Sequence, residues 1–393
     1  MTRRGAIPIA DASGAPPAKE IPHVSSLAER WLSIRNRLLA NPRFQKFASS
    51  TPGIRTIARG KARAVFDLLS GFIYSQVLLA CVRLDLFRLL EKQPLTLEAI
   101  AARANLPLDP ARRLLDAAVS LDLMCKLKDG RYGLGMNGAA ILANPGIAAM
   151  VEHNAILYSD LADPVDFLRH PDRETALSRY WAYAQSEDPS KLPDEAVRGY
   201  SALMSASQPL VASEILDAYP FQNHKCLLDV GGGEGRFLCS AGERYTHLAL
   251  MMFDLPAVAA RAQKNIAANG LADRAQTFGG SFFTDELPIG ADIVTLVRIL
   301  HDHDDEKAAQ LLTNIHRSLP PGGHLLIAEP LAETRGAERM GDAYFAFYLM
   351  AMRSGRPRSL GTIENMLRRS GFSDVRAVPT RVPLQTSLIV AQT

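Results

Sequence analysis

A histidine and a carboxylate follow two apolar runs late in the chain. His301 comes directly after ADIVTLVRIL, and Glu329 ends HLLIAE. Both runs indicate strands of one parallel sheet, so both side chains are expected at its carboxyl edge, where ligands bind. A histidine titrates near neutral pH and can take a proton from a hydroxyl that attacks an electrophile. Glu329 could orient the ring by accepting its other proton.

A structural alternative exists for this region. His301 and His303 could be loop histidines in the charged, solvated turn HDHDDE. Neither they nor Glu329 show the spacing of metal ligands, so no metal is expected.

The stretch CLLDVGGGEGR predicts a ligand-binding turn between a strand and a helix. Its glycines alternate at Gly231, Gly233 and Gly235. Such a turn needs positive φ, and it lets the backbone touch a ligand without an intervening Cβ. Dinucleotide folds prefer G-x-G-x-x-G, but the third position here is Arg236. This spacing suits a ligand without phosphates, of which S-adenosylmethionine is the commonest; a purely structural glycine turn is the alternative.

A carboxylate farther along supports a nucleoside site. Asp254 ends the next apolar run, 23 residues after Gly231. A carboxylate at that place can accept both ribose hydroxyls. Asp229, the acid before the glycines, is expected to hold the loop through backbone N–H groups or to meet the ligand's amino group.

Composition limits what the scaffold can be. The chain has 393 residues, 47% hydrophobic and 22% charged, with a net charge of +3 and four cysteines. These values are typical of a soluble protein of two or three domains without a strong attraction for nucleic acid. The cysteines suit a reducing, cytoplasmic location, and no secretory segment is visible. The apolar stretch 68–82 is short for a membrane span, so a buried helix is expected there.

The first two predicted regions are an extension over residues 1–60 and a compact unit over 61–150. The extension combines a disordered start with an amphipathic helix over 27–47 that carries interspersed arginines and lysines. This helix could pack on its own domain or a dimer partner, or lie on an anionic membrane. The compact unit has predicted N-caps at Thr96 and Asp109 and a hairpin turn at Asp129-Gly130, which indicates a winged helix. Dimerisation is favoured over DNA binding, because the second helix carries acids as well as arginines.

The other two regions are a helical connector, 151–215, and a sheet domain, 216–393. The connector could form core or line a large apolar substrate pocket. Its region is rich in aromatic residues: Tyr158, Phe167, Tyr180, Trp181, Tyr183 and Tyr200. In the last region strand and helix patterns alternate, which predicts a parallel, doubly wound sheet. The fold class is therefore α/β, a Rossmann-like sheet with an N-terminal helical winged-helix domain.

Several motifs together resemble a known family. LLDVGGGEG, MFDLP, GGSFF, RILHDHDDE, PPGGHLLIAEP and SGFSDV occur in the order found in class I S-adenosylmethionine-dependent O-methyltransferases of the plant type. The resemblance implies S-adenosylmethionine as cofactor, S-adenosylhomocysteine as product, no metal, and a homodimer formed through the winged-helix domain. It makes His301 the base and Glu329 the acid that positions it. It assigns cofactor binding to Asp229, Gly231, Gly233, Gly235, Asp254, Leu255, Ser281, Phe282 and Arg298, and substrate contact to Met204 and Asp302.

Two positions depart from the family pattern. The family's adenine-contacting acid is replaced by Ser281, so that contact could pass to backbone atoms or to Asp302. A second acid near the base is replaced by Pro357. A clamp of two carboxylates on His301 is therefore expected to be incomplete.

Further likeness concerns the acceptor. FIYSQVLLACVRLDLF, the basic N-terminal segment and HDHDDE resemble methyltransferases of purple-bacterial carotenoid biosynthesis, which act on the C-1 hydroxyl of demethylspheroidene or hydroxyneurosporene. This resemblance implies an acyclic hydroxycarotenoid acceptor, and the basic segment suggests peripheral contact with the inner or photosynthetic membrane. A phenolic or polyketide-type acceptor is the main alternative, and a winged-helix DNA-binding regulator is a distant one. A NAD-linked dehydrogenase is disfavoured because the dinucleotide spacing is absent.

Overall fold

The computed structural model describes residues 27–181 and 194–393. For residues 194–202 and 206 the structure describes the backbone but not the side chains. The chain divides into two compact units, residues 1–75 and 76–393, and each is described by itself.

The N-terminal unit contains two short helices and the beginning of a long one. The single helix predicted over 27–47 is wrong, because the chain forms α1 (Leu27–Leu39) and α2 (Pro42–Ser50). The break falls at Asn41, whose side chain accepts a hydrogen bond from the backbone N–H of Arg43 at 2.9 Å. Pro42 at the first position of α2 has no N–H to donate to a preceding turn.

Helix α3 (Ile54–Arg83) continues into the second unit. The expectation of a buried helix over 68–82 is wrong for its first half, where Leu68 is 78% and Phe72 65% exposed. Leu79 and Cys81, near its end, are buried. Among the described helices, α3 is long and apolar enough to cross a membrane by length and composition alone.

The winged-helix region follows the predicted order with one shifted boundary. Its elements are α4 (Leu86–Leu89), α5 (Leu97–Arg103), α6 (Leu108–Ser120), β1 (Met124–Lys126), β2 (Tyr132–Leu134) and α7 (Met136–Leu142). The Thr96 side chain caps α5 by accepting from Ala99 N, and β1 pairs with β2 around the predicted turn. The predicted cap at Asp109 is wrong, because α6 already begins at Leu108 and Asp109 pairs with Arg113 in its first turn.

The connector is helical, as its residue pattern predicts. It contains α8 (Pro145–Asp160), α9 (Pro164–Arg169), α10 (Ala176–Tyr180) and α12 (Asp194–Ala218). Phe167 and Trp181 are buried, whereas Tyr158 is 38% exposed. Tyr183 and the side chain of Tyr200 lie outside the described residues.

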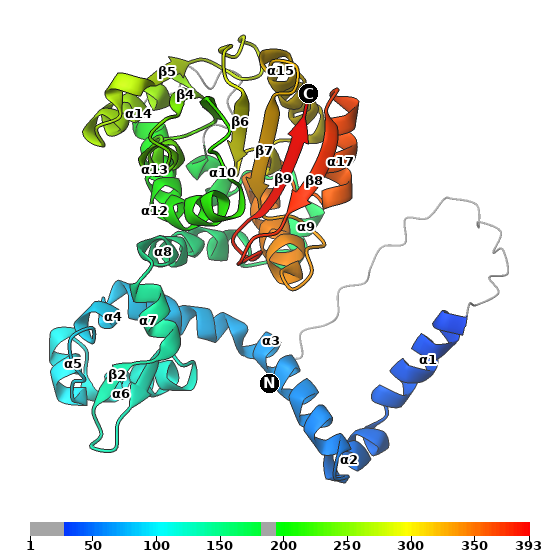
Figure 1. Cartoon of the computed structure of the whole chain (residues 1–393). Coiled ribbons are helices and arrows are strands. Elements are labelled where there is room, and N and C mark those ends of the chain that lie inside the picture. The colour runs from blue at the N-terminus through cyan, green and yellow to red at the C-terminus, as the bar shows by residue number, and fades with distance from the viewer. Residues whose placement is uncertain (1–26, 182–193) are drawn as a thin grey trace. The chain divides into compact units, whose positions relative to one another are not determined.

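The C-terminal region forms a seven-stranded sheet in the order β5-β4-β3-β6-β7-β9-β8 (Figure 1). The strands are β3 (Cys226–Val230), β4 (Ala249–Asp254), β5 (Ala275–Gly279), β6 (Ile293–Val297), β7 (His324–Glu329), β8 (Ser373–Val378) and β9 (Ser387–Gln392). The doubly wound sheet is confirmed, and one strand departs from the predicted parallel direction, since β9 runs antiparallel to β7 and β8.

Helices cover both faces of this sheet, which explains the unbroken apolar runs of its central strands. One core cluster includes residues of α12, α13 (Arg236–Arg244) and α14 (Pro256–Ala268). The other includes residues of α15 (Asp305–Ser318) and α17 (Leu360–Arg369). Because β3 pairs with β4 on one side and β6 on the other, the strand order reverses at β3. In such sheets ligands bind at this switch point.

Candidate active site

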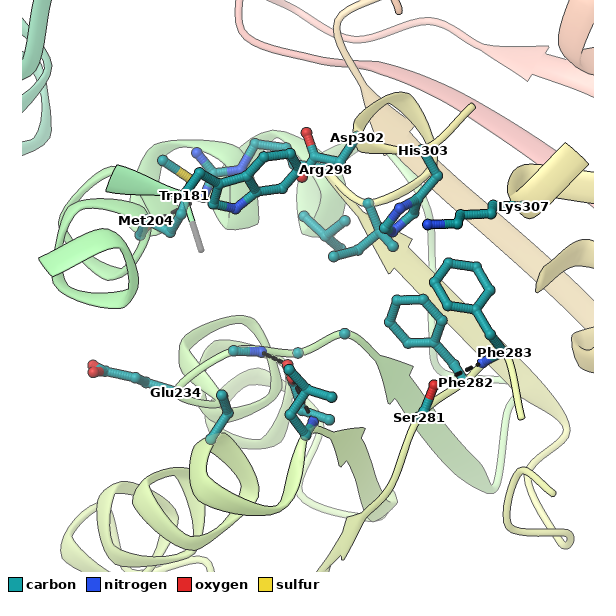
Figure 2. A pocket seen from close by; sticks show the side chains of 18 of the residues that line it. Trp181, Met204, Glu234, Ser281, Phe282, Phe283, Arg298, Asp302, His303 and Lys307 are labelled. Carbon is teal, nitrogen blue, oxygen red and sulfur yellow. Dashed lines mark hydrogen bonds between the residues drawn. The ribbon is translucent and has the colours of Figure 1, made fainter. Parts of the chain in front are cut away.

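A cavity of about 350 Å³ lies at the carboxyl ends of β3, β4 and β6. Figure 2 shows Trp181 and Met204 on one side of it and the Phe282–Phe283 pair on the other. Nine of the residues predicted for cofactor or substrate line this cavity: Met204, Gly231, Gly233, Asp254, Leu255, Ser281, Phe282, Arg298 and Asp302. Four other predicted residues, Asp229, Gly235, His301 and Glu329, are not among its lining.

The glycine loop adopts the positive φ angles that its spacing predicts. Gly231, Gly233 and Gly235 have φ of +70°, +59° and +73°. A Cβ on Gly231 would lie 2.6 Å from a methyl carbon of Ile299, whereas a Cβ on Gly233 would meet no atom within 4 Å. The loop therefore lines the cavity with backbone at Gly233, and Gly235 serves as the left-handed residue before α13.

Asp254 is anchored at the edge of the cavity. Its Oδ2 accepts from Gly233 N at 2.8 Å and its Oδ1 from Leu255 N at 2.7 Å. Burial raises the pKa of Asp254 to about 6, so the carboxylate is largely ionised at neutral pH. Each oxygen retains a further lone pair for a donor such as a ribose hydroxyl.

Asp229 has a different role from the predicted one. It is 1% exposed, and its Oδ1 accepts from the Thr295 hydroxyl at 2.7 Å. The loop N–H groups of Gly231 and Gly233 instead meet Phe253 O and Asp254. Burial raises the pKa of Asp229 to about 7. A Cβ on Gly232 would lie 2.7 Å from Asp229 Oδ2, so the carboxyl packs against the glycine loop without accepting from its amides.

An aromatic wall stands opposite the loop. Phe282 and Phe283 contact each other edge to face, with ring centres 4.7 Å apart, and His303 packs edgewise on both. Burial lowers the pKa of His303 to about 4, so its ring is neutral at neutral pH. Ser281 stands where the family has an acid, and its backbone N–H donates to Asp285 at 2.8 Å. This N–H is therefore already paired.

The alternative partner that the sequence offered for adenine, Asp302, is engaged elsewhere. Its Oδ1 lies 3.2 Å from Nε2 of His301, and both side chains are buried. They belong to the short turn Leu300–Asp302 that follows β6. Glu329 Oε2 accepts from the backbone N–H of His301 at 3.1 Å. The predicted hydrogen bond between Glu329 and the ring is therefore not formed: Asp302 bonds the ring, and Glu329 bonds the backbone that carries it.

The surrounding charges set the protonation of His301. Burial acts to lower its pKa, but the hydrogen bond and charge of Asp302, with the charge of Glu329, outweigh burial and raise it. Within the described part of the chain, Nδ1 of His301 and Oε1 of Glu329 are buried without a hydrogen-bond partner. Because Asp302 occupies Nε2, Nδ1 is the ring nitrogen left to accept a proton.

Sequence reasoning missed Arg358, which stabilises this turn. It is 2% exposed and donates to Leu300 O at 2.9 Å, to His303 O at 2.6 Å and to Asp305 Oδ1 at 2.8 Å. The position that lacks the family acid, Pro357, is its neighbour. In place of the expected second acid, Arg358 holds the backbone of the turn and Asp302 bonds the ring of His301.

Arg298 bridges the end of β6 to α12. Its φ is +58°, a strained value for a residue other than glycine. The guanidinium donates to the Ser207 hydroxyl at 2.8 Å, to Met204 O at 3.1 Å and to Gln208 Oε1. It therefore fixes the helix that presents Met204 to the cavity.

Beyond His301 the surroundings are aromatic. A π-helix, η4 (Arg339–Phe345), leads into α16 (Ala346–Met352) and places the Phe345 ring 5.6 Å from that of His301. Tyr348 bonds His153 at 2.8 Å, and burial lowers the pKa of His153 to about 4. This cluster therefore carries no charge at neutral pH. Sequence periodicity did not reveal the π-helix.

Other lining residues also escaped prediction. Lys307 and Gln310 lie one turn apart on α15 and both line the cavity. Gln310 donates to Phe283 O at 2.7 Å, which ties α15 to the aromatic wall. Their spacing of three residues on one helix was the sequence signal that could have placed both side chains on the same face. No group of three or more His, Cys, Asp or Glu in the described ranges could hold a metal ion.

The sequence is similar to those of known proteins. The family model of an O-methyltransferase domain matches residues 158–373, and that of an O-methyltransferase dimerisation domain matches 66–143. Demethylspheroidene O-methyltransferase of Cereibacter sphaeroides is 41% identical over 90% of this chain and 93% of its own. The enzyme of that name from Rhodobacter capsulatus is 39% identical over 91% and 88%.

Solved structures agree in fold. Human N-acetylserotonin methyltransferase in complex with SAM has a TM-score of 0.71 at 24% identity, over 85% of this chain and 97% of its own. The mitomycin 7-O-methyltransferase MmcR has a TM-score of 0.69 at 24% identity, over 86% and 100%.

Proposed function

The chain belongs to the O-methyltransferase family that carries an N-terminal dimerisation domain, and from this we propose that it methylates an acyclic hydroxycarotenoid. The methyl donor is S-adenosylmethionine, and the acceptor is the C-1 hydroxyl of demethylspheroidene or hydroxyneurosporene. The products are a methoxy carotenoid and S-adenosylhomocysteine. The observation that carries the proposal is 41% identity over 90% of the chain to an enzyme named demethylspheroidene O-methyltransferase.

The cavity residues fit the donor. Asp254 keeps lone pairs for ribose hydroxyls, Gly233 leaves the approach free of side chains, and Phe282 offers an aromatic face for adenine. When bound, S-adenosylmethionine supplies an already activated methyl group. The protein's main task is then alignment, which can contribute much of the rate enhancement.

The aromatic cluster fits the proposed acceptor. Phe345 and Tyr348 extend the surroundings of His301 without adding charge, and the hydroxyl of Tyr348 is already paired with His153. A polyene chain requires burial in apolar surroundings and offers few groups for hydrogen bonds. A phenolic acceptor would also fit aromatic walls, so it remains the second candidate.

Proton transfer is assigned to His301. Its Nδ1 accepts the proton of the acceptor hydroxyl as the oxygen attacks the methyl group. Asp302 stabilises the charged ring through Nε2, and Glu329 and Arg358 hold the turn in place. A tertiary alcohol is a very weak acid, so proton removal is concerted with attack.

Methyl transfer to two acceptor sets tests the proposal. The protein is incubated with labelled S-adenosylmethionine and either detergent-solubilised hydroxycarotenoids or a panel of phenols. Label is expected in the carotenoid fraction. Transfer to phenols alone would overturn the carotenoid assignment and establish the second candidate.

The pH dependence of activity should depend on Asp302. A protonated imidazole cannot accept a proton, so activity is lost as pH falls through the raised pKa of His301. In Asp302→Asn the main group that raises this pKa is neutralised while burial remains. The acid limb of kcat/KM should therefore shift to lower pH, with a reduced plateau. Glu364→Gln, at a partly exposed carboxylate of α17 that pairs with Arg368, is the control and should leave the acid limb in place. An acid limb that stays in place in Asp302→Asn would contradict the pairing.

A further inference from the structure

Residues 27–65 form a segment that precedes both family models, which begin at 66 and 158. The solved structures are matched over 97% and 100% of their own chains, yet cover 85% and 86% of this one. Part of this chain therefore has no counterpart in them. We call residues 27–65 the basic extension.

The charge of the basic extension is one-sided. It contains nine Lys or Arg residues and one acid, Glu29, out of 44 and 41 in the chain. Its net charge is thus +8, against −5 for all other residues together. Such a concentration attracts an anionic surface even though the protein as a whole is nearly neutral.

Helix α1 arranges these charges around an apolar stripe. No residue of α1 is buried. The stripe has helical spacing and is formed by Leu27, Trp31, Ile34 and Leu38, which are 86%, 65%, 58% and 47% exposed. Arg30 and Arg37 flank it on one side and Arg35 on the other. Long basic side chains on both flanks of an apolar stripe are typical of helices that lie in the headgroup layer of a bilayer.

The same pattern continues beyond α1. Phe47 in α2 and Ile57 in α3 are 56% and 68% exposed, and basic residues lie next to or near both in the sequence. The exposed apolar residues of α3 from Phe66 onward differ, because they fall inside the dimerisation domain and few basic residues accompany them. That later stripe fits a second copy of the chain.

We propose that the basic extension binds peripherally to an anionic lipid surface, with the α1 stripe in the acyl boundary and the arginines at lipid phosphates. The purpose rests on the proposed function: an acyclic carotenoid dissolves in the bilayer, so an enzyme held at its surface meets the acceptor there. Binding itself requires only charge and the apolar stripe.

Vesicle sedimentation with the full chain tests this inference. Wild type is expected to bind vesicles of mixed phosphatidylglycerol and phosphatidylcholine but not vesicles of phosphatidylcholine alone. Added salt should release the bound protein. The triple variant Arg30→Glu, Arg35→Glu, Arg37→Glu should bind at least about tenfold more weakly, given about fivefold per basic side chain near the surface. A matched control reverses three exposed basic residues elsewhere: Arg103→Glu, Lys128→Glu, Arg169→Glu. The control should bind as wild type does.

Three results would overturn the inference: equal binding by the triple variant and wild type, equal loss in the control, or no vesicle binding by wild type. A change from dimer to monomer in the triple variant, with no vesicle binding by wild type, would assign the stripe to a second copy. Methyl transfer in detergent reports separately on the proposed function. Its absence with vesicle binding intact would refute the carotenoid acceptor and leave membrane binding standing.

Discussion

His301→Ala is expected to lower the turnover of methyl transfer by about 10²–10⁴-fold, the usual contribution of a general base. The affinity for S-adenosylhomocysteine should stay close to that of wild type, because the His301 side chain is not part of the cavity lining that includes Gly233 and Asp254. Single-turnover rates with labelled donor and calorimetric titration of the product measure the two quantities. Such a loss in turnover with unchanged affinity separates proton transfer from binding.

Controls are needed because His301 is buried. His301→Gln retains more volume and a hydrogen-bonding group but cannot act as a base, so it should lose turnover as well. His170→Ala, at the exposed residue that follows α9, should leave turnover unchanged. Thermal melting checks that each variant is folded. Turnover near the wild-type rate in a folded His301→Ala would remove the base from the mechanism.

The cofactor half of the site was accessible from sequence because spacing and backbone conformation determine it. Only glycine adopts the positive φ of Gly231 and Gly233 freely, so the loop is visible as a pattern of letters. Asp254 lies at the end of a strand whose length and position follow from its apolar run. Both features depend on local chain geometry.

The hydrogen-bond partners of His301 could not be predicted from the sequence in this way. The sequence places Asp302 and Glu329 at one edge of the sheet, but which carboxylate meets the ring depends on the short turn Leu300–Asp302. That turn points the Asp302 carboxylate at Nε2 and leaves the backbone N–H of His301 to Glu329. The long-range bonds of Arg358 are hidden from sequence for the same reason.

Two errors in the fold have simpler causes. The reversed direction of β9 follows from its short connection to β8, since adjacent parallel strands need a crossover of about a dozen residues or more. The short connection between the two strands was visible in the sequence. The exposure of the first half of α3 was not predictable from its composition, because an apolar helix can be buried by its own domain or by a second chain. The match to a dimerisation domain from residue 66 supports the second explanation.

Arg358→Met is expected to reduce the free energy of unfolding by about 3 kcal/mol, because it leaves buried carbonyls without a charged donor. The guanidinium is 2% exposed, and Leu300 O and His303 O both accept from it. Its bonds to Asp305 add less, since that carboxylate is half exposed. Urea unfolding followed by circular dichroism measures the change.

The neighbouring Arg356 provides a matched comparison. It also pairs with Asp305, but its side chain is 61% exposed, so Arg356→Met should cost about 1 kcal/mol or less. Equal losses in the two variants would show that Asp305, and not the turn backbone, is what Arg358 stabilises. Because the turn carries His301 and Asp302, folded Arg358→Met should also show a lower kcat and an altered acid limb in its pH profile. A purely structural arginine would reduce stability and leave both unchanged.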